Sequence, residues 1–217
     1  MRIPLFLTAI IVLLASCASF SSENPQEDQA LLVENSSLNL TSTQAKLIEA
    51  ADWMEGRRSL KINGRTFGLD CTGIVLAAYW YAGIDLAKDF GSYTGNGVRR
   101  LYYYLDDKAL LYNTDLPHPG DIIFWDNTWD ANGNEVADDS HTHVGMIVSM
   151  DRSTGAGTYL HYNYSKGIVK EKINLLDPDN PAVNSPLRMR SLPKVDGYRY
   201  LSSQLVNELG RGYELGS

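Results

Sequence analysis

The stretch that decides the fold reads Asp70-Cys71-Thr72-Gly73-Ile74-Val75-Leu76-Ala77-Ala78-Tyr79-Trp80-Tyr81. After its first four residues every side chain is apolar or aromatic, and Gly83, a residue type that commonly ends helices, follows soon after. The pattern predicts a short helix buried on all sides, because an amphipathic surface helix would carry a polar face. Asp70 is placed to cap this helix, so Cys71 is expected in its first turn.

The segments around this helix predict an α+β fold, with helices first and an antiparallel sheet after them. Ser42 or Thr43 offers an N-cap to an amphipathic helix that ends at Gly56. Asn63-Gly64 indicates a two-residue hairpin turn, because both turn positions need positive φ. Further expected elements are a helix at 98–105 and strands at 60–62, 65–67, 121–125, 143–150, 158–162, 167–172 and 198–201.

The composition excludes several classes of protein. With 44% hydrophobic and 21% charged residues, the chain fits one globular domain with short appendages, which excludes disorder or a fibrous architecture for its bulk. Its 19 Lys and Arg residues against 26 Asp and Glu residues give a formal charge of −7, without any basic run. A nucleic-acid partner is therefore not expected, since binding phosphates needs clustered positive charge.

The start of the chain predicts an export signal and a tether. Residues 1–16 contain a mostly apolar run that is too short to span a bilayer, and the sequence Leu14-Ala15-Ser16-Cys17 follows it. This tetrad resembles the lipobox of bacterial lipoproteins, in which the cysteine is lipidated; an ordinary signal peptide is the alternative. We expect an exported protein that is anchored to the bacterial cell envelope by lipid on Cys17, with a flexible tether at 17–43. A domain at 44–201 and a C-terminal tail at 202–217 follow.

Cys71 is the candidate nucleophile of this sequence. With Cys17 in the anchor, Cys71 has no disulfide partner, and an unpaired thiol in an oxidising compartment is a hazard unless it is buried or used. Burial as a small core residue is the alternative. A helix start favours the nucleophilic thiolate, but the charge of Asp70 opposes it. A histidine is therefore needed as ion-pair partner or proton acceptor.

Two of the four histidines suit that role. His143 and His161 each open or close a strand pattern, so one can serve as general base while the second orients it through the other ring nitrogen. A metal site is the rival interpretation. In that site His141 and His143 would lie on one strand face, with His118 or Asp121 completing the ligands.

Four short motifs resemble those of the NlpC-type cell-wall cysteine peptidases, papain-like bacterial enzymes that cut peptidoglycan stem peptides. The motifs are Asp70-Cys71-Thr72-Gly73, Pro119-Gly120-Asp121-Ile122-Ile123-Phe124, His143-Val144-Gly145 and Tyr159-Leu160-His161. The resemblance covers roughly residues 44–176. It implies a papain-like α+β fold, in which N-terminal helices pack on an antiparallel sheet. It also implies a monomeric thiol hydrolase that needs no cofactor or metal ion.

The resemblance assigns roles to individual residues. It implies Cys71 as nucleophile, His143 as general base and His161 as the third triad residue, with Asp70 and Thr72 lining a pocket for a substrate amine. The family usually has Ser where Thr72 stands, so amine recognition departs from its pattern. The bond that the family typically cleaves joins D-glutamate to a diamino acid. Two alternatives remain: a peptidoglycan amidase of the related CHAP type, and a non-catalytic envelope-binding lipoprotein with the same fold.

The segment at 126–142 is longer and more acidic than the link that this family usually has at this place. Residues 130–134 weakly resemble a calcium loop, although Thr128 occupies the expected first-ligand position. A solvated, turn-rich loop is the alternative.

Strand pairing decides whether His143 and His161 meet. A symmetric turn between their strands would pair His161 with Ile147 and leave His143 about 13 Å away, at roughly 3.3 Å per residue. The triad therefore needs His143 directly opposite His161, with a tight turn at 151–153, or else a bulge among residues 154–158. We expect the two rings on one sheet face, one hydrogen bond apart, with the far side of His143 toward the Cys71 sulfur.

Overall fold

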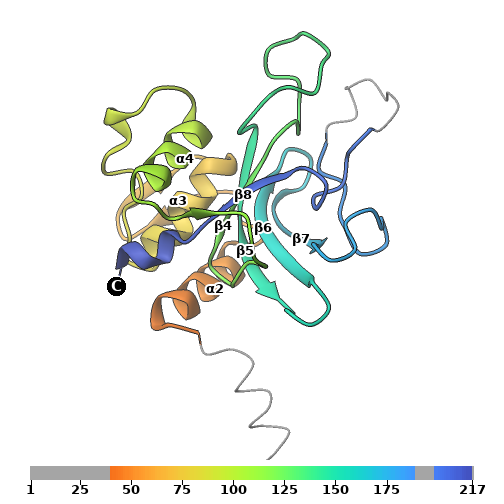
Figure 1. Ribbon diagram of the computed structural model, residues 1–217. Coiled ribbons are helices and arrows are strands. Elements are labelled where there is room, and N and C mark those ends of the chain that lie inside the picture. Colours follow the sequence, from red (N-terminus) through yellow and green to blue (C-terminus); the bar gives the residue numbers. More distant parts are fainter. Residues whose placement is uncertain (1–39, 189–197, 217) are drawn as a thin grey trace, which may run out of the picture. The chain divides into compact units, whose positions relative to one another are not determined.

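The protein is described by a computed structural model that covers residues 40–188 and 198–216. These residues form an α+β fold in which three helices lie beside an antiparallel sheet of six strands (Figure 1). The helices are α2 (Ser42–Met54), α3 (Cys71–Tyr81) and α4 (Gly97–Asp107), with 3-10 turns η1 (Phe90–Ser92) and η2 (Gly212–Gly216). A separate hairpin consists of β1 (Leu60–Ile62) and β2 (Arg65–Phe67). The sheet strands are β3 (Leu111–Tyr112), β4 (Ile122–Trp125), β5 (His143–Met150), β6 (Ala156–Asn163), β7 (Gly167–Asn174) and β8 (Val206–Gly210).

The N-terminal boundary of the domain differs from the expected one. The expected signal peptide at 1–16, Cys17 and the tether up to residue 39 lie outside the described residues. The N-cap of α2 is Thr41 rather than Ser42 or Thr43. Its hydroxyl accepts the Gln44 N–H and the Gln44 side chain accepts the Thr41 N–H, and this reciprocal capping box draws the helix start one residue earlier. The domain therefore begins before residue 44.

Helix α3 forms where the apolar run predicts it. The Asp70 carboxylate accepts the Gly73 N–H at 2.8 Å and so caps the first turn. A Cβ on Gly73 would lie 2.2 Å from the Gly68 carbonyl oxygen, so only glycine lets the chain from the β1-β2 hairpin pass directly against this turn. The hairpin itself has the expected turn, with φ of 49° at Asn63 and 82° at Gly64. Together these features bring Cys71 to the surface end of a buried helix.

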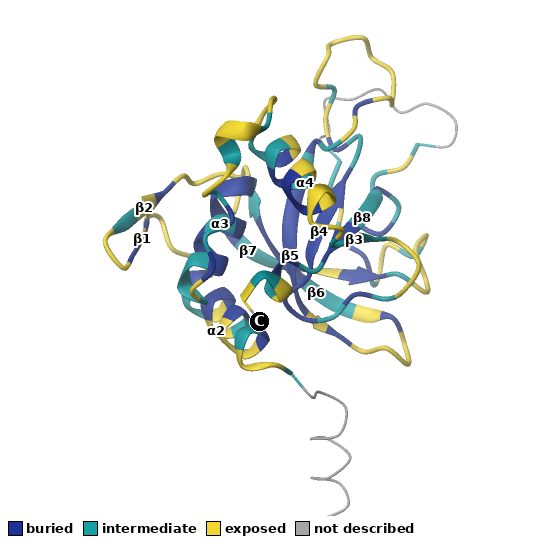
Figure 2. Ribbon diagram, turned by 60° about the vertical axis from the view of Figure 1, so that its left-hand side comes forward, coloured by how far each residue is buried: buried dark blue, intermediate teal, exposed yellow. Residues whose placement is uncertain are grey.

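The sheet has the strand order β3-β8-β4-β5-β6-β7, and every neighbouring pair is antiparallel. Adjacent residues of a strand face opposite sides, so the sheet contributes to two cores. Phe124 and Val144 pack in the main core with the helices, whereas Trp125, Ile147 and Tyr159 form a smaller core on the other side. Figure 2 shows the central strands buried and most connecting loops exposed.

Strand β8 (Val206–Gly210) lies inside the expected tail at 202–217 and belongs to the sheet, so this segment is part of the domain and not a tail. Strand β8 lies between β3 and β4, and Leu209 pairs with Tyr112 on one side and Ile123 on the other. The expected strand at 198–201 does not form, because Leu201 makes only an isolated bridge to Pro186. Residues 206–210 carry a weak strand pattern of their own, and pairing on both edges compensates for it.

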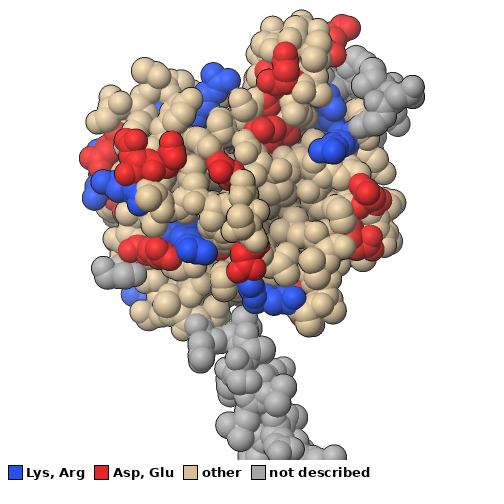
Figure 3. All heavy atoms as spheres, in the orientation of Figure 1, with Lys and Arg blue, Asp and Glu red and all other residues tan. Residues whose placement is uncertain are grey.

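The charged side chains on the surface are mixed in sign. On the face of the molecule that Figure 3 shows, basic residues are scattered among acidic ones and do not gather in one patch. Exposed ion pairs such as Arg152–Asp115, with 2.7 Å between the charged atoms, contribute little to stability. Among the described residues no helix is both long and apolar enough to cross a membrane.

Candidate active site

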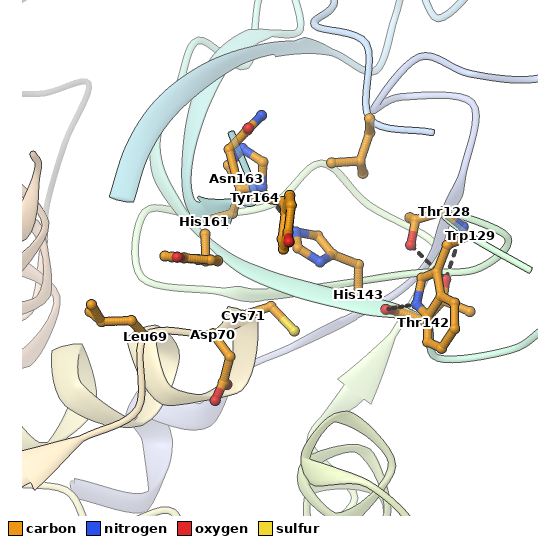
Figure 4. A pocket seen from close by; sticks show the side chains of 12 residues that line it. Leu69, Asp70, Cys71, Thr128, Trp129, Thr142, His143, His161, Asn163 and Tyr164 are labelled. Carbon is orange, nitrogen blue, oxygen red and sulfur yellow. Dashed lines mark hydrogen bonds between the residues drawn. The ribbon is translucent and has the colours of Figure 1, made fainter. Parts of the chain in front are cut away.

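The structure brings Cys71, His143 and His161 to the wall of one pocket of about 460 Å³ (Figure 4). Cys71 comes from the start of α3, and the histidines come from the neighbouring strands β5 and β6. Asp70 lines the same pocket. Leu69, Trp129 and Tyr164 add exposed apolar surface, and Tyr164 is 89% exposed. The three residues expected to form a triad thus share one cleft with an apolar rim.

The Cys71 thiol lies close to the first residues of β5. Burial raises the pKa of the thiol and the Asp70 charge raises it further, while the influence of Thr72 and of the Val144 backbone only partly opposes the rise. Cys71 therefore carries its proton at neutral pH.

The two imidazoles are joined directly, as expected. The distance between His143 Nε2 and His161 Nδ1 is 2.9 Å, and the ring planes stand at 86° to each other. Burial, with His161 as the second cause, lowers the pKa of His143 to about 3, although Glu171 acts in the opposite direction. His143 is therefore a neutral imidazole at neutral pH, and Nδ1 is its ring nitrogen outside the bond to His161.

The register that joins the rings differs from both expected ones. Met146 pairs with Leu160, whereas Met150 pairs with Gly157, so the register shifts by one between Ile147 and Ser149. The irregularity lies in the middle of the paired segment and not among residues 154–158. Continuing the Met146–Leu160 register places His161 opposite Gly145, two residues along the strand from His143. Diagonal side chains on one sheet face are still within reach of each other, which explains the contact.

Gly145 makes room for this diagonal contact. A Cβ at residue 145 would lie 2.8 Å from the Leu160 carbonyl oxygen and 3.0 Å from the Trp125 ring. The Trp125 indole instead packs beside His143, with 5.7 Å between the ring centroids. The Trp125 ring from the neighbouring strand thus occupies the space that a side chain at residue 145 would need.

Glu171 on β7 completes the arrangement and belongs to none of the motifs quoted from the sequence. Its Oε2 lies 3.1 Å from His161 Nε2, and its Oε1 lies 2.7 Å from Lys166 Nζ. Burial acts to raise the pKa of this carboxyl group, but the hydrogen bonds from His161 and Lys166 prevail and lower the pKa to about 2. Glu171 is therefore a carboxylate at neutral pH.

A signal for Glu171 was present in the β6-β7 turn. Asn163 pairs with Gly167, which has a φ of 80°. A three-residue turn followed by a glycine at positive φ fixes the hairpin register and sets Glu171 opposite Tyr159, on the face that carries His161. Reading the turn as the four residues between the expected strands would have placed Glu171 on the other face.

The two residues expected to bind a substrate amine differ in access. Asp70 is exposed and lines both the main pocket and a second pocket of about 570 Å³, and Cys71 also lines both. Thr72 is buried, and its side chain fills the space where a Cβ on Gly97 would lie. Asp70 is thus well placed to meet a ligand, whereas Thr72 has little accessible surface.

The segment at 126–142 supplies a wall of both pockets through Trp129. The indole N–H donates to the Thr142 carbonyl oxygen at 3.2 Å, which holds the ring at the rim. At the tip, the Asp130 carboxylate accepts backbone N–H groups of its own loop, and Asp138 accepts the side-chain amides of Asn132 and Asn134. These contacts are typical of a turn-rich loop.

The rival metal site does not form among the described residues. His141 has a φ of 53° and precedes β5, and its ring packs on Tyr102 of α4 with 3.8 Å between centroids. The rings of His141 and His143 therefore do not share a strand face. Within the described ranges, no group of three or more His, Cys, Asp or Glu side chains is arranged to hold a metal ion.

A scan against models of protein families found no match for this chain, and a search of curated proteins found none either.

Proposed function

We propose that this protein is a papain-like cysteine peptidase of the NlpC type that hydrolyses peptidoglycan stem peptides between D-glutamate and a diamino acid. The observation that supports this most is the 2.9 Å bond between His143 and His161 in the pocket that also contains Cys71. A thiol and an oriented imidazole in one cleft are what acyl transfer to cysteine requires. The motifs in which these residues occur add the resemblance to the family.

In the proposed reaction His143 acts first as a base and then as an acid. Nδ1 takes the thiol proton of Cys71 while the sulfur attacks the carbonyl carbon of the scissile amide. Backbone N–H groups at the start of α3 stabilise the negative charge on the carbonyl oxygen. The C–N bond then breaks, His143 gives the proton to the leaving amine, and the acyl group remains on Cys71 as a thioester. Water, deprotonated by His143, hydrolyses the thioester and restores the thiol.

The neutral state of both partners supports this order of events. Because the pKa of Cys71 is raised and that of His143 is lowered, the resting pair is a thiol and an uncharged imidazole. In the proposed reaction the thiol proton therefore has still to move to His143 when the substrate binds. Asp70, which is exposed at the pocket, is the group proposed to bind a substrate amine.

Two other functions remain as alternatives with distinct outcomes. A CHAP-type amidase would use the same residues but release the stem peptide from N-acetylmuramic acid. An envelope-binding lipoprotein would need neither a thiol nor a histidine pair, and the buried bond from His161 to Glu171 has no role in it.

The test is digestion of purified peptidoglycan by the full-length protein, with the released fragments identified by mass spectrometry. We expect new termini at D-glutamate and the diamino acid, and a loss of at least about 1,000-fold in rate for Cys71→Ala. Cys71→Ala should keep the wild-type melting temperature. New termini at L-alanine would identify the amidase instead. Absence of cleavage, or equal cleavage by Cys71→Ala, would contradict a cysteine hydrolase.

We further propose that the protein is exported and anchored to the bacterial envelope by lipid on Cys17. The tetrad Leu14-Ala15-Ser16-Cys17 supports this proposal. Cys17→Ser should abolish metabolic labelling with a fatty acid and release the protein from membranes. Unchanged labelling would contradict lipidation at Cys17.

A further inference from the structure

The carboxylate of Glu171 lies at the far end of a chain of hydrogen bonds that leads to the reactive pair. It contacts His161 Nε2 at 3.1 Å, and His161 Nδ1 contacts His143 Nε2 at 2.9 Å. His161 is 1% exposed, so water does not compete for its ring nitrogens. Tyr159 also donates its hydroxyl toward Glu171 Oε2, at 3.4 Å. Each link in this chain has a donor and an acceptor, and the direction of one bond decides the direction of the next.

Glu171 determines which atom is the donor in each hydrogen bond of this chain. A carboxylate only accepts, so the proton between it and His161 belongs to His161 Nε2. A neutral His161 then has an unprotonated Nδ1, which accepts from His143 Nε2–H. His143 is left with an unprotonated Nδ1, the form that can take a thiol proton.

The alternative arrangement of protons requires a positively charged His161 next to Glu171, which already pairs with the positive charge of Lys166. A doubly protonated His161 would donate from Nδ1, and His143 would carry its own proton at Nδ1 and could not act as a base. Lys166 Nζ already lies 2.7 Å from Glu171 Oε1 and balances the carboxylate. An imidazolium beside this pair would be a buried charge in excess of its counter-charge, which is costly.

We infer that Glu171 is a positioning residue that fixes His143 in the Nε2–H tautomer through His161, and so prepares Nδ1 to accept the Cys71 proton. Glu171 does not touch the reacting atoms, and its effect passes through both rings. The catalytic consequence rests on the proposed function, whereas the tautomer itself is a property of the resting protein.

The tautomer can be measured directly on the full chain, labelled with ¹⁵N-histidine, by long-range ¹H–¹⁵N spectroscopy. For His143 we expect a protonated Nε2 and an unprotonated Nδ1 at neutral pH. In Glu171→Gln the amide can donate as well as accept, so the population with a proton at His143 Nδ1 should grow. Glu55→Gln removes a carboxylate from the exposed contact with Lys170 and is the matched control, for which no change is expected.

Activity gives the second readout. Glu171→Gln should lower kcat by at least about tenfold with little change in KM, because a residue that orients a catalytic group acts on the chemical step. Glu171→Asp, which keeps the charge, should retain more activity than Glu171→Gln, and thermal melting checks the fold of each variant.

Failure of the inference and failure of the proposed function give different results. The inference is overturned if wild-type His143 carries its proton at Nδ1, or if a folded Glu171→Gln leaves the tautomer unchanged. Wild-type spectra test it even if the variants do not fold. If the tautomer is as expected but no stem peptide is cleaved, the positioning of His143 stands and the proposed function fails.

Discussion

The protonation of Cys71 is governed by burial and by the neighbouring Asp70. Both disfavour the thiolate and so raise the pKa of the thiol. Asp70→Asn keeps a good N-cap while it removes the charge. We therefore expect the pH profile of alkylation by iodoacetamide to shift to lower pH in Asp70→Asn, and the wild-type midpoint to lie above that of an ordinary cysteine. A wild-type midpoint below that of free cysteine would contradict a protonated resting thiol.

Asp121 is a second residue whose ionisation has consequences. Its carboxyl group is fully buried. The Tyr112 hydroxyl and the His118 backbone N–H donate to Oδ2, but Oδ1 has no hydrogen-bond partner among the described residues. Burial raises the pKa of Asp121 to about 6 against those hydrogen bonds. The folded-state pKa thus exceeds the unfolded value, so this group's stabilising contribution is complete below about pH 4 and is lost as pH rises through 6.

Asp121→Asn tests this dependence. Asparagine removes the cost of burying the charge. The free energy of unfolding of the variant should therefore exceed that of wild type by up to about 3 kcal/mol at pH 8, and this gain should be absent at pH 4. Thermal melting at pH 4, 6 and 8 measures the difference. An advantage or deficit that is the same at all three values would show that Asp121 does not titrate in this range.

At the scale of the elements, the diagonal contact between β5 and β6 depends on Gly145. Gly145→Ala places a Cβ against a backbone oxygen and the buried Trp125 ring, neither of which can move freely. We expect a loss of about 1–3 kcal/mol in the free energy of unfolding and a larger loss of activity than stability alone explains. Gly91→Ala is the control, because no atom of the described residues would lie within 4 Å of the added Cβ. An unaffected melting temperature in Gly145→Ala would contradict the close packing.

Local patterns were sufficient to predict α3, the β1-β2 hairpin and β5, because each depends on residues next to one another in the chain. The contact between His143 and His161 was also expected. Its register was not, because the shift between Ile147 and Ser149 leaves no sign in the alternation of the strand. Glu171 was missed because a turn of four residues between β6 and β7 would put it on the opposite sheet face from His161, whereas the actual turn has three residues.

At the scale of the whole molecule, the sheet includes β8, which is the last strand in the described sequence and lies between β3 and β4. The insertion of β8 between β3 and β4 was not predictable from the sequence, because it depends on a return of the chain over about 80 residues rather than on a local pattern. Without β8, β4 would become an edge strand and the core around Leu205 and Leu209 would be exposed.

Truncation tests the importance of this strand. A chain that ends at Gln204 lacks all of β8 and should lose its cooperative thermal transition, whereas a chain that ends at Leu215 should keep it. Circular dichroism during heating distinguishes the two. Wild-type melting of the shorter chain would mean that residues 205–217 are dispensable, as a tail would be.

The most direct measurement for the molecule as a whole is the mass of Cys71 during turnover. The full-length protein is mixed with a synthetic stem peptide that contains the D-glutamyl–diamino acid bond, quenched in acid within the first turnover and digested for mass spectrometry. We predict that the peptide carrying Cys71 gains the mass of the acyl part ending in D-glutamate, while the diamino acid part appears free in equal amount. Cleavage with no adduct on Cys71, together with undiminished cleavage by Cys71→Ala, would contradict a mechanism that passes through this thiol.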